Sequence, residues 1–167
     1  MEVYRCAAQV VFFVANNLEP FNRQKRMQRE YPDRPIVGVG AIIVEAGRVL
    51  LARRANPPRA GQWSLPGGVV ELGETLRAAT EREALEETGL IVEAGEVVEV
   101  LDRIIPGKDE ATQYHYVLVD FLCSHRGGAL RAGGDAAEVA WASEEELGAY
   151  NLEPITLEVI KKAVRNG

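Results

Sequence analysis

Two hydrophobic stretches precede a glycine-rich segment in the first half of the chain. Val37 to Val44 and Val49 to Leu51 are rich in β-branched and aliphatic residues, and the more polar stretch Glu45–Arg48 separates them. Apolar runs on either side of a short polar break are typical of two strands joined by a tight connection. We therefore expect the first ordered unit of this chain to be a β-hairpin.

The segment after this hairpin predicts a helix with recognisable ends. Gly67 and Gly68 follow a proline and mark a turn. Glu74 and Thr75 give acidic and capping character to a helix start, and Gly89 supplies a C-terminal stop. The order along the chain is therefore strand, loop and helix.

Two further apolar runs predict strands in the second half. Glu96–Ile105 and Tyr114–Cys123 are joined by a loop that spans Pro106–Glu110. The second run is nearly continuously apolar, which is typical of a strand that is covered on both faces. We expect Tyr114–Cys123 to be a central strand of the sheet.

The remaining segments are shorter and more polar. Gly127–Gly128 and Gly133–Gly134 predict turns, and Val139–Trp141 predicts a short strand. Ser143, with Glu146 three residues later, resembles a capping box that opens a helix.

A last helix is predicted from Pro154, because proline is favoured at the first helical position. An apolar stripe follows it, made of Ile155, Val159, Ala163 and Val164. Together the segments predict an α/β (α+β) protein in which strands are mixed with about three helices.

The length, charge and cysteine content of the chain exclude several classes of protein. A chain of 167 residues is expected to form one domain that is large enough for a substantial hydrophobic core. A net charge of −6 argues against general nucleic-acid binding, which needs a basic surface. No apolar run is long enough to span a membrane. Cys6 and Cys123 have no metal or redox spacing, and Cys123 ends an apolar run, so it is expected to be a core thiol in a reducing cytoplasm.

The first thirty-odd residues follow a different pattern. Cys6–Ala15 is apolar, but Glu2 and the lack of a clear cleavage site argue against a signal peptide. We expect this run to pack on the domain as a strand or a helix. A basic cluster follows it, and a solvated helix face is the favoured interpretation over an anion-guiding or nucleic-acid-binding surface. The cluster comprises Arg23, Lys25, Arg26, Arg29 and Arg34.

The most informative chemistry lies on the helix predicted between Glu74 and Gly89. Glu83, Glu86 and Glu87 are three and four residues apart, so their carboxylates share one helix face. Like charges at this spacing destabilise a helix by some tenths of a kcal/mol per pair. A hard divalent cation would remove this repulsion and prefers oxygen ligands. The spacing therefore predicts a metal site.

These residues belong to a longer pattern, G-x5-E-x7-R-E-U-x-E-E-x-G-U, in which U is aliphatic or small. The positions that match it are Gly68, Glu74, Arg82, Glu83, Ala84, Glu86, Glu87, Gly89 and Leu90. The pattern resembles the signature of the Nudix hydrolases, enzymes that cleave nucleoside diphosphates linked to another group. The resemblance implies an α/β/α sandwich with a mixed sheet. It places the Nudix domain at 35–167, the signature at 68–90 and an N-terminal extension at 1–34, which as in other members could support a homodimer.

The resemblance also implies roles for these residues. Mg²⁺ or Mn²⁺ would bind Glu83 and Glu87, with Glu86 as a third ligand and the carbonyl of Gly68 as a fourth. Magnesium keeps several waters in octahedral oxygen coordination and acidifies them, which suits attack on a diphosphate. An ion pair between Arg82 and Glu74 is expected to fix the loop against the helix.

The base that activates the attacking water is less well determined by the sequence. In relatives it often lies on a loop after the signature, and Asp135 occupies such a position. Glu138, Asp109 and Glu110 are alternatives, and Glu83 could accept the proton itself. Each of these acids is also compatible with simple solvent exposure, so geometry within hydrogen-bond reach of a water must decide.

The resemblance to bacterial ADP-ribose pyrophosphatases covers roughly Arg34 to Arg165. ADP-ribose-cleaving relatives carry a proline sixteen residues after the signature, and Pro106 stands there, although prolines also open turns for structural reasons. The expected substrate is a small nucleotide, ADP-ribose, cleaved to AMP and ribose 5-phosphate. A (d)NTP pyrophosphohydrolase that sanitises the nucleotide pool and a non-catalytic nucleotide-sensing module are the alternatives.

Several other side chains are candidates for substrate contact. Arg54 could meet a phosphate or form a surface ion pair, and Trp63 could stack on a base or pack beside its own turn. Tyr114 and Tyr116 share one strand face, where they are expected to line the pocket, whereas His115 is expected to be half-buried. Glu138 is the remaining candidate for a substrate contact.

Overall fold

The computed structural model describes residues 28–57 and 59–166, and residues 1–27 therefore lie outside it. The apolar run Cys6–Ala15 and most of the basic cluster fall in that part of the chain. The described strands are β1 (Ile36–Glu45), β2 (Arg48–Arg54), β3 (Trp63–Ser64), β4 (Gly67–Val69), β5 (Leu90–Pro106), β6 (Thr112–Gly128) and β7 (Ala136–Ser143). The helices are α2 (Leu76–Thr88) and α3 (Pro154–Asn166), with short 3₁₀ turns η1 (Lys108–Glu110) and η2 (Leu147–Tyr150).

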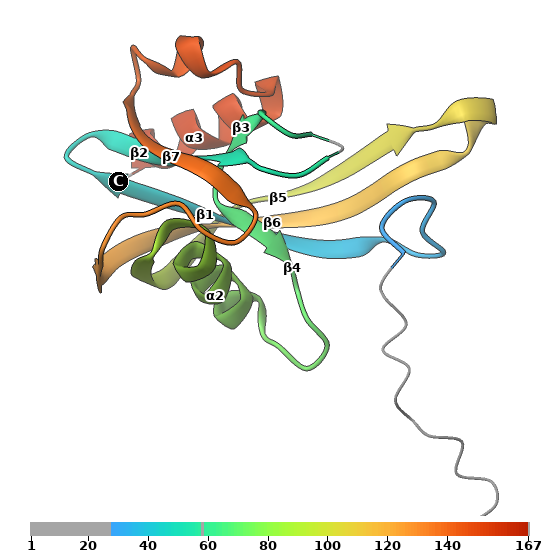
Figure 1. The fold of residues 1–167 in the computed structure, drawn as a ribbon, viewed down its shortest axis with the longest axis horizontal. Coiled ribbons are helices and arrows are strands. Elements are labelled where there is room, and N and C mark those ends of the chain that lie inside the picture. The colour runs from blue at the N-terminus through green and yellow to red at the C-terminus, as the bar shows by residue number, and fades with distance from the viewer. Residues whose placement is uncertain (1–27, 58, 167) are drawn as a thin grey trace, which may run out of the picture.

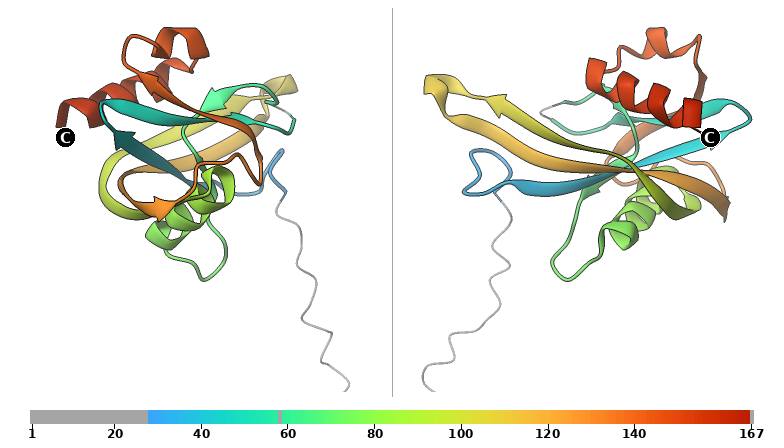
Figure 2. Two further views of the ribbon diagram at one scale, coloured as in Figure 1. Left: turned by 60° about the vertical axis from the view of Figure 1, so that its left-hand side comes forward. Right: turned by 180° about the vertical axis from the view of Figure 1, so that it is seen from behind.

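The strands form a mixed sheet between two helices. The main strand order is β3-β2-β1-β6-β5, while β4 pairs with β1 and β7 pairs with β2. Strands β1 and β6 are parallel, and the other pairs are antiparallel. Helix α2 covers one face and α3 the other (Figures 1 and 2). The α/β/α sandwich with a mixed sheet that the sequence predicted is therefore confirmed.

Each helix buries its own apolar cluster against the sheet. On the α2 side, Ala79 and Ala84 pack with Val119 and Phe121 of β6. On the α3 side, Val159 and Ile160 pack with residues of β1 and β2. Alternate residues of a strand point to opposite faces, so the same strands feed both clusters. Cys123 is buried in the α2-side cluster, as expected, and burial raises the pKa of its thiol to about 12.

The first hairpin and the signature helix begin and end close to their predicted positions. Ala46 and Gly47 connect β1 to β2 with φ angles of 49° and 74°, as a two-residue hairpin turn requires. The Thr75 hydroxyl accepts a 3.2 Å hydrogen bond from the Ala78 N–H, which caps α2. The helix ends at Gly89, which has a left-handed conformation with a φ of 71°.

Strands β5 and β6 extend well beyond the predicted limits. The strand expected at Glu96–Ile105 begins at Leu90, because breaks in register between Ala94 and Glu99 let the chain bend without leaving the sheet. Gly127–Gly128 was expected to be a turn but pairs with Leu90 and Ile91 at the end of β6. Strand β6 is internal to the sheet, as predicted.

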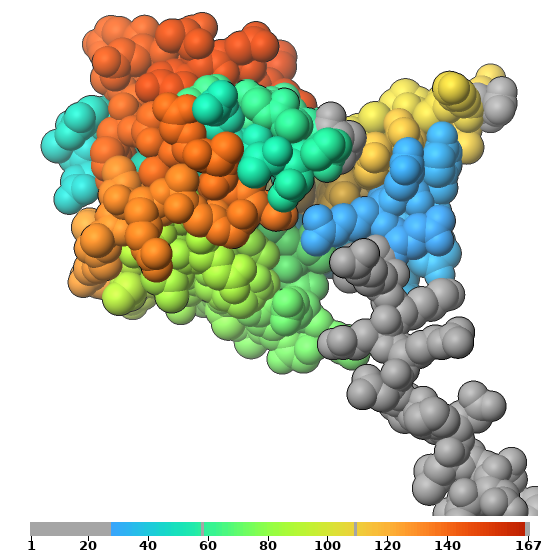
Figure 3. Space-filling view, viewed as in Figure 1, coloured from blue at the N-terminus to red at the C-terminus, as the bar shows by residue number. Residues whose placement is uncertain are grey.

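The far half of this hairpin projects from the body of the protein. Strand β1 accompanies β6 only from Tyr116 to Cys123, so β5 and β6 pair with each other alone beyond that point. Figure 3 shows this arm projecting from the molecule, with the segment before β1 against its side. The Tyr31 N–H donates a 2.8 Å hydrogen bond to the Gln113 carbonyl and so holds that segment there.

The prediction of a helix that starts at Ser143 is wrong, because the structure has a short 3₁₀ turn that begins at Leu147. Glu146 does accept a 2.8 Å hydrogen bond from the Ser143 N–H, as in a capping box. However, the following residues form only the four-residue turn η2, which ends at Asn151 in a left-handed conformation. Pro154 then opens α3, so too few residues remain between for an α-helix. The described residues therefore contain two α-helices, and neither is long and apolar enough to cross a membrane.

Candidate active site

A cavity of about 470 Å³ runs from α2 along the α3-side face of the sheet. Strands β1, β4 and β6, the β2–β3 connection and the start of α3 all contribute to its walls. Its volume falls in the range typical of small-molecule sites. At one end it is lined by acidic and basic residues, which are Arg54, Glu83, Glu87 and Asp135.

Helix α2 directs two of the three predicted glutamates into this cavity. Glu83 and Glu87 are one helical turn apart and both line it. Glu87 is only 7% exposed. Glu86 lies on the exposed side, with a side chain that is 54% accessible and 3.5 Å from the Arg82 guanidinium. The structure thus brings Glu83 and Glu87 together and leaves Glu86 at the rim.

The two glycines that precede the helix make contact with these carboxylates. The Gly67 N–H donates a 3.0 Å hydrogen bond to Glu87. A Cβ placed on Gly68 would lie 2.3 Å from a carboxylate oxygen of Glu83, so only glycine lets that carboxylate lie against the backbone of β4. The strand and the helix of the signature are therefore fitted to each other at the site itself.

Burial and mutual repulsion change the acidity of both glutamates. Burial raises the pKa of Glu87 to about 7, and the charges of Glu83 and Asp135 act in the same direction. Burial also raises the pKa of Glu83, although the hydrogen bond from Arg82 opposes this. Carboxylates with raised pKa values in a cavity are characteristic of functional sites.

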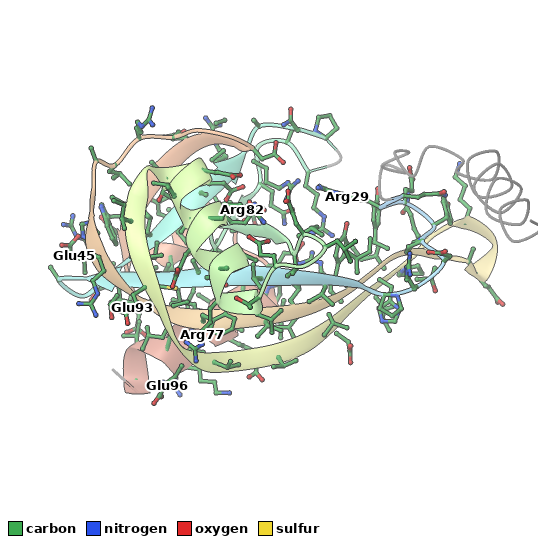
Figure 4. All side chains as sticks on the ribbon, turned by 90° about the horizontal axis from the view of Figure 1, so that it is seen from below. Arg29, Glu45, Arg77, Arg82, Glu93 and Glu96 are labelled. Carbon is green, nitrogen blue, oxygen red and sulfur yellow. The ribbon has the colours of Figure 1, made fainter. Side chains whose placement is uncertain are left out.

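Arg82 holds Glu74 and Glu83 in fixed positions. Its Nε and Nη2 donate 2.9 Å hydrogen bonds to the two oxygens of Glu74, and Nη1 donates one of 2.8 Å to Glu83. Nη2 also reaches the Val69 carbonyl of β4. The bidentate bond to Arg82 lowers the pKa of Glu74. Figure 4 shows Arg82 and Arg77 leaving α2 on different sides.

The donor set suits a hard divalent cation. Glu83, Glu87 and Asp135 supply only oxygen ligands, and their repulsion is the kind that Mg²⁺ or Mn²⁺ relieves. In the described part of the chain, however, no three Asp, Glu, His or Cys side chains already converge around one point that could hold an ion. Arg82 and the Gly67 N–H hold the two glutamates instead. The residues fit the ion in chemistry, while their side chains are paired with protein donors.

Asp135 and Arg54 complete the charged end of the cavity. Asp135 lies just before β7, where its carboxylate accepts a 3.0 Å hydrogen bond from the Asn56 amide. Its backbone carbonyl accepts a bond from the Ala55 N–H, which ties this loop to the end of β2. The Arg54 Nε is buried without a hydrogen-bond partner among the described residues, and its charge acts on Glu87. An unpaired guanidinium edge beside carboxylates is suited to an anionic substrate.

The other predicted site residues are divided between the cavity and the surface. Tyr116 lines the cavity and stacks with Tyr114, with a ring-centroid distance of 6.3 Å. Glu138 pairs with Arg53 at 2.7 Å outside the cavity lining. Pro106 is exposed at the end of β5 and does not line the cavity either. Glu110 is exposed on η1, far along the arm.

Trp63 has both an aromatic packing contact and a place in the cavity wall. It lines the cavity, and its ring meets that of Tyr150 edge to face at a centroid distance of 4.9 Å. The Arg53 guanidinium lies 5.8 Å from the same ring. One edge of the tryptophan is therefore fixed by packing, while part of it faces the cavity.

Comparison with known proteins identifies the family. The NUDIX domain model matches residues 34–163, which is most of the chain. The protein belongs to the Nudix family. The Nudix match includes the whole signature, all of α2 and all but the last three residues of α3, so it agrees in extent with the described fold.

Three curated relatives of this Nudix protein carry different substrate names. It is 40% identical over 104 residues to an ADP-ribose pyrophosphatase of Methanocaldococcus jannaschii, a match that covers 62% of this chain but only 59% of that protein. It is 42% identical over 113 residues to a putative 8-oxo-dGTP diphosphatase of Mycobacterium tuberculosis, covering 67% and 75%. It is 36% identical over 124 residues to the CTP pyrophosphohydrolase of Escherichia coli, covering 74% and 87%.

The solved structures give the same answer for the fold. A MutT NUDIX hydrolase from Burkholderia pseudomallei superposes with a TM-score of 0.67 at 32% identity, covering 78% of this chain and 98% of that one. The Nudix fold of this chain is thus shown by sequence and by structure.

Two features of this Nudix cavity were not predicted from the sequence. Asp120 lines it from β6 and is only 8% exposed. Glu153, just before α3, accepts hydrogen bonds from Gln62 at 2.9 Å and from Arg59 and Arg103. A single charged residue in the apolar run around Asp120 was a usable signal. The Glu153 cluster joins segments up to 94 residues apart and had none.

Proposed function

We propose that this Nudix protein hydrolyses ADP-ribose to AMP and ribose 5-phosphate with the help of Mg²⁺ or Mn²⁺. The observation that carries the proposal is the pair of buried, mutually repelling carboxylates, Glu83 and Glu87, at one end of the cavity. A site that gathers negative charge next to an unpaired arginine edge suits an anionic substrate accompanied by a cation. The membership of the family supports a pyrophosphohydrolase.

Glu83 and Glu87 are the side chains that would hold the ion, with Glu86 at the rim as a third ligand and the Gly68 carbonyl as a backbone ligand. When bound, such an ion screens the diphosphate oxygens and acidifies a water. Arg82 and Glu74 fix the loop and the helix relative to each other, so that these oxygens keep their spacing. Pre-positioned ligands reduce the cost of assembling the site when substrate arrives.

The reaction adds water across one P–O–P linkage. The water oxygen bonds to one phosphorus, the bridging oxygen leaves with the other phosphoryl group, and the water loses a proton. Asp135 is the proposed acceptor of this proton, because it lines the cavity beside Glu83 and Glu87. Its hydrogen bond from Asn56 orients the carboxylate. Arg54 is proposed to pair with a phosphate oxygen of the substrate.

Support for ADP-ribose comes from two sides. The relative from Methanocaldococcus jannaschii is named an ADP-ribose pyrophosphatase, and Pro106 stands where the resemblance to such enzymes requires a proline. The cavity also continues from the carboxylates to Tyr114 and Tyr116, which leaves room for a long substrate beyond the diphosphate.

A (d)NTP pyrophosphohydrolase is the second candidate function. It is supported by the relatives named 8-oxo-dGTP diphosphatase and CTP pyrophosphohydrolase, each of which this chain covers over three quarters or more of its length. In that reaction the products are a nucleoside monophosphate and inorganic pyrophosphate. The same carboxylates would serve both reactions, because the bond type is the same.

A substrate panel separates these activities. With saturating Mg²⁺, AMP and ribose 5-phosphate formed from ADP-ribose would support the proposal, and a preference for dNTPs with release of pyrophosphate would support the second candidate. Tight nucleotide binding without turnover under Mg²⁺ or Mn²⁺ would instead indicate a nucleotide-sensing module. Product analysis by chromatography distinguishes the three.

We also propose that the protein acts as a homodimer in the cytoplasm, without nucleic-acid or membrane partners. The support is the negative charge of the chain and the N-terminal extension at 1–34. Sedimentation of the full chain at micromolar concentration tests this. A monomer at all concentrations would overturn the dimer.

A further inference from the structure

Asp120 is a buried carboxylate that has no partner in the described protein. It lies on β6, is 8% exposed, and faces the cavity. No hydrogen bond or ion pair joins it to any residue within 28–57 and 59–166. Burial, together with the charge of Glu99 on the neighbouring strand, raises its pKa to about 6. A carboxylate that faces a cavity without a protein partner is available to a ligand, so a role outside the folding of the chain is indicated.

The backbone opposite Asp120 is shaped to leave room for it. Asp120 pairs in register with Gly40 of β1, where a Cβ would lie 2.1 Å from the Asp120 Oδ1. The carboxylate therefore lies over the bare backbone of Gly40, close to Leu65. Any larger residue at position 40 would push it aside. The sequence of β1 thus accommodates the carboxylate and its position within the cavity.

The position of Asp120 relative to the proposed diphosphate site is fixed by the sheet. Gly40 pairs on its other side with Gly67, whose N–H binds Glu87. Two neighbouring strand spacings separate Asp120 from Gly67, or about 10 Å between Cα atoms. This distance is similar to that between the 5′-phosphate and the far edge of the base in a nucleotide. With the diphosphate at Glu83 and Glu87, Asp120 would lie beside the nucleoside and away from the bond that is cleaved.

The surroundings of Asp120 suit a flat, partly apolar group. Leu118 lies two residues before it on the same face of β6, and Leu65 and Val159 line the cavity as well. Trp63 adds an aromatic edge to the same cavity. Apolar side chains beside a small number of polar groups are the usual arrangement for orienting a ligand.

We propose that Asp120 selects the substrate by accepting a hydrogen bond from an N–H group of its nucleobase. The inference rests on the proposed function, because it assumes that the diphosphate lies at Glu83 and Glu87. It adds that the base lies against Leu65 and Leu118 and presents an amino or imino edge to Asp120. A charged acceptor discriminates strongly against a base that lacks the donor, since its own burial is then uncompensated.

The test measures binding of nucleoside monophosphates by calorimetry with Mg²⁺ present, so it does not depend on turnover. AMP, GMP and CMP are compared with donor-free partners, which are purine ribonucleoside 5′-monophosphate and 2-pyrimidinone ribonucleoside 5′-monophosphate. In the wild type, at least one natural nucleotide is expected to bind about tenfold tighter than its donor-free partner. In Asp120→Asn that ratio is expected to fall to about twofold or less, because the charged acceptor is gone.

Asp120→Asn keeps the size of the side chain, and a thermal melt shows that it folds. Asp102→Asn, on the exposed face of β5, is the matched control and should leave every affinity unchanged. If Asp120→Asn lowers the affinity for natural and donor-free nucleotides equally, the inference is overturned. It is also overturned if the variant loses affinity for AMP but not for dAMP, because Asp120 would then bind the 2′-hydroxyl. Failure of all three natural nucleotides to bind would overturn it too. If the protein hydrolyses ADP-ribose but binds natural and donor-free nucleotides equally well, the inference about Asp120 is overturned while the proposed function stands.

Discussion

The Gly67 N–H donates a 3.0 Å hydrogen bond to the carboxylate of Glu87 and thereby ties the strand before the signature helix to the end of that helix. Glu87 is buried, and its neighbours in the cavity include Glu83 and Arg54. One backbone donor therefore helps to hold a carboxylate whose environment otherwise disfavours its charge. The first two predictions concern this residue.

Glu87→Gln should abolish turnover while the protein stays folded. The amide keeps the shape of the side chain but removes one negative ligand, so we expect kcat/KM to fall by at least about a hundredfold at subsaturating Mg²⁺. Steady-state kinetics over a metal titration measures this. Glu158→Gln, an exposed residue of α3, is the matched control. Near-normal activity of the Glu87 variant would remove Glu87 from the proposed metal ligands.

The metal-free protein should lose stability as the pH rises from about 4.5 to about 7. Glu87 has a pKa of about 7 in the folded protein and an ordinary value of 4.5, so the folded state binds the proton more tightly than the unfolded state does. The contribution of Glu87 to the free energy of unfolding is fully present below pH 4.5 and is lost as the pH rises to about 7, where Glu87 ionises in the folded protein. The change corresponds to about 3 kcal/mol at most.

Chemical denaturation in EDTA across this pH range measures the loss. Glu87→Gln cannot ionise at this position, so its free energy of unfolding should fall less between pH 4.5 and 7.5. Mg²⁺ should raise the stability of the wild type above pH 7 and have a smaller effect on the variant. Identical pH profiles for both proteins would contradict the prediction.

Arg82→Lys should lower both stability and activity. A lysine cannot make the bidentate pair with Glu74 or reach Glu83 and the Val69 carbonyl at the same time. We expect a loss of about 1–2 kcal/mol and a decrease in Tm of roughly 3–8 °C. Differential scanning calorimetry is the measurement.

Arg126→Lys provides the matched control for Arg82. Arg126 also donates two hydrogen bonds to one glutamate, Glu93, but both side chains are more than half exposed. An exposed pair of this kind contributes little, so its loss should cost less than about 1 kcal/mol. If the two variants melt at the same temperature, Arg82 has no special structural role.

Glu153→Gln should weaken substrate binding with little effect on the chemical step. Although burial opposes it, the hydrogen bonds from Arg103 and Gln62 lower the pKa of Glu153, so the residue acts as a charged anchor. The anchor holds Arg59, Gln62 and Arg103 at the wall of the cavity, and these residues lie outside the helix that carries Glu83 and Glu87. We expect KM to rise about tenfold while kcat changes less than about twofold. A fall in kcat with unchanged KM would place Glu153 in the reaction itself.

The local pattern of the chain was sufficient for the signature helix and its surroundings. Thr75 and Gly89 set the ends of α2 through short-range hydrogen bonds and backbone conformation, which depend on neighbouring residues alone. The spacing of Glu83 and Glu87 fixed their common face for the same reason, and the nine signature positions identified the family. The prediction of a helix after Ser143 was wrong, because a capping pattern does not indicate how many residues remain before the next element begins.

Only the tertiary structure decided which charged residues meet. Glu86 has the same local spacing as its neighbours but lies at the rim, because packing against the sheet sets the rotation of α2. Asp120 and Gly40 are eighty residues apart and come together only because β1 and β6 pair in one register. Glu153 likewise gathers Arg59 and Arg103 from separate elements. Contacts of this kind follow from strand order and register, which short-range preferences do not encode.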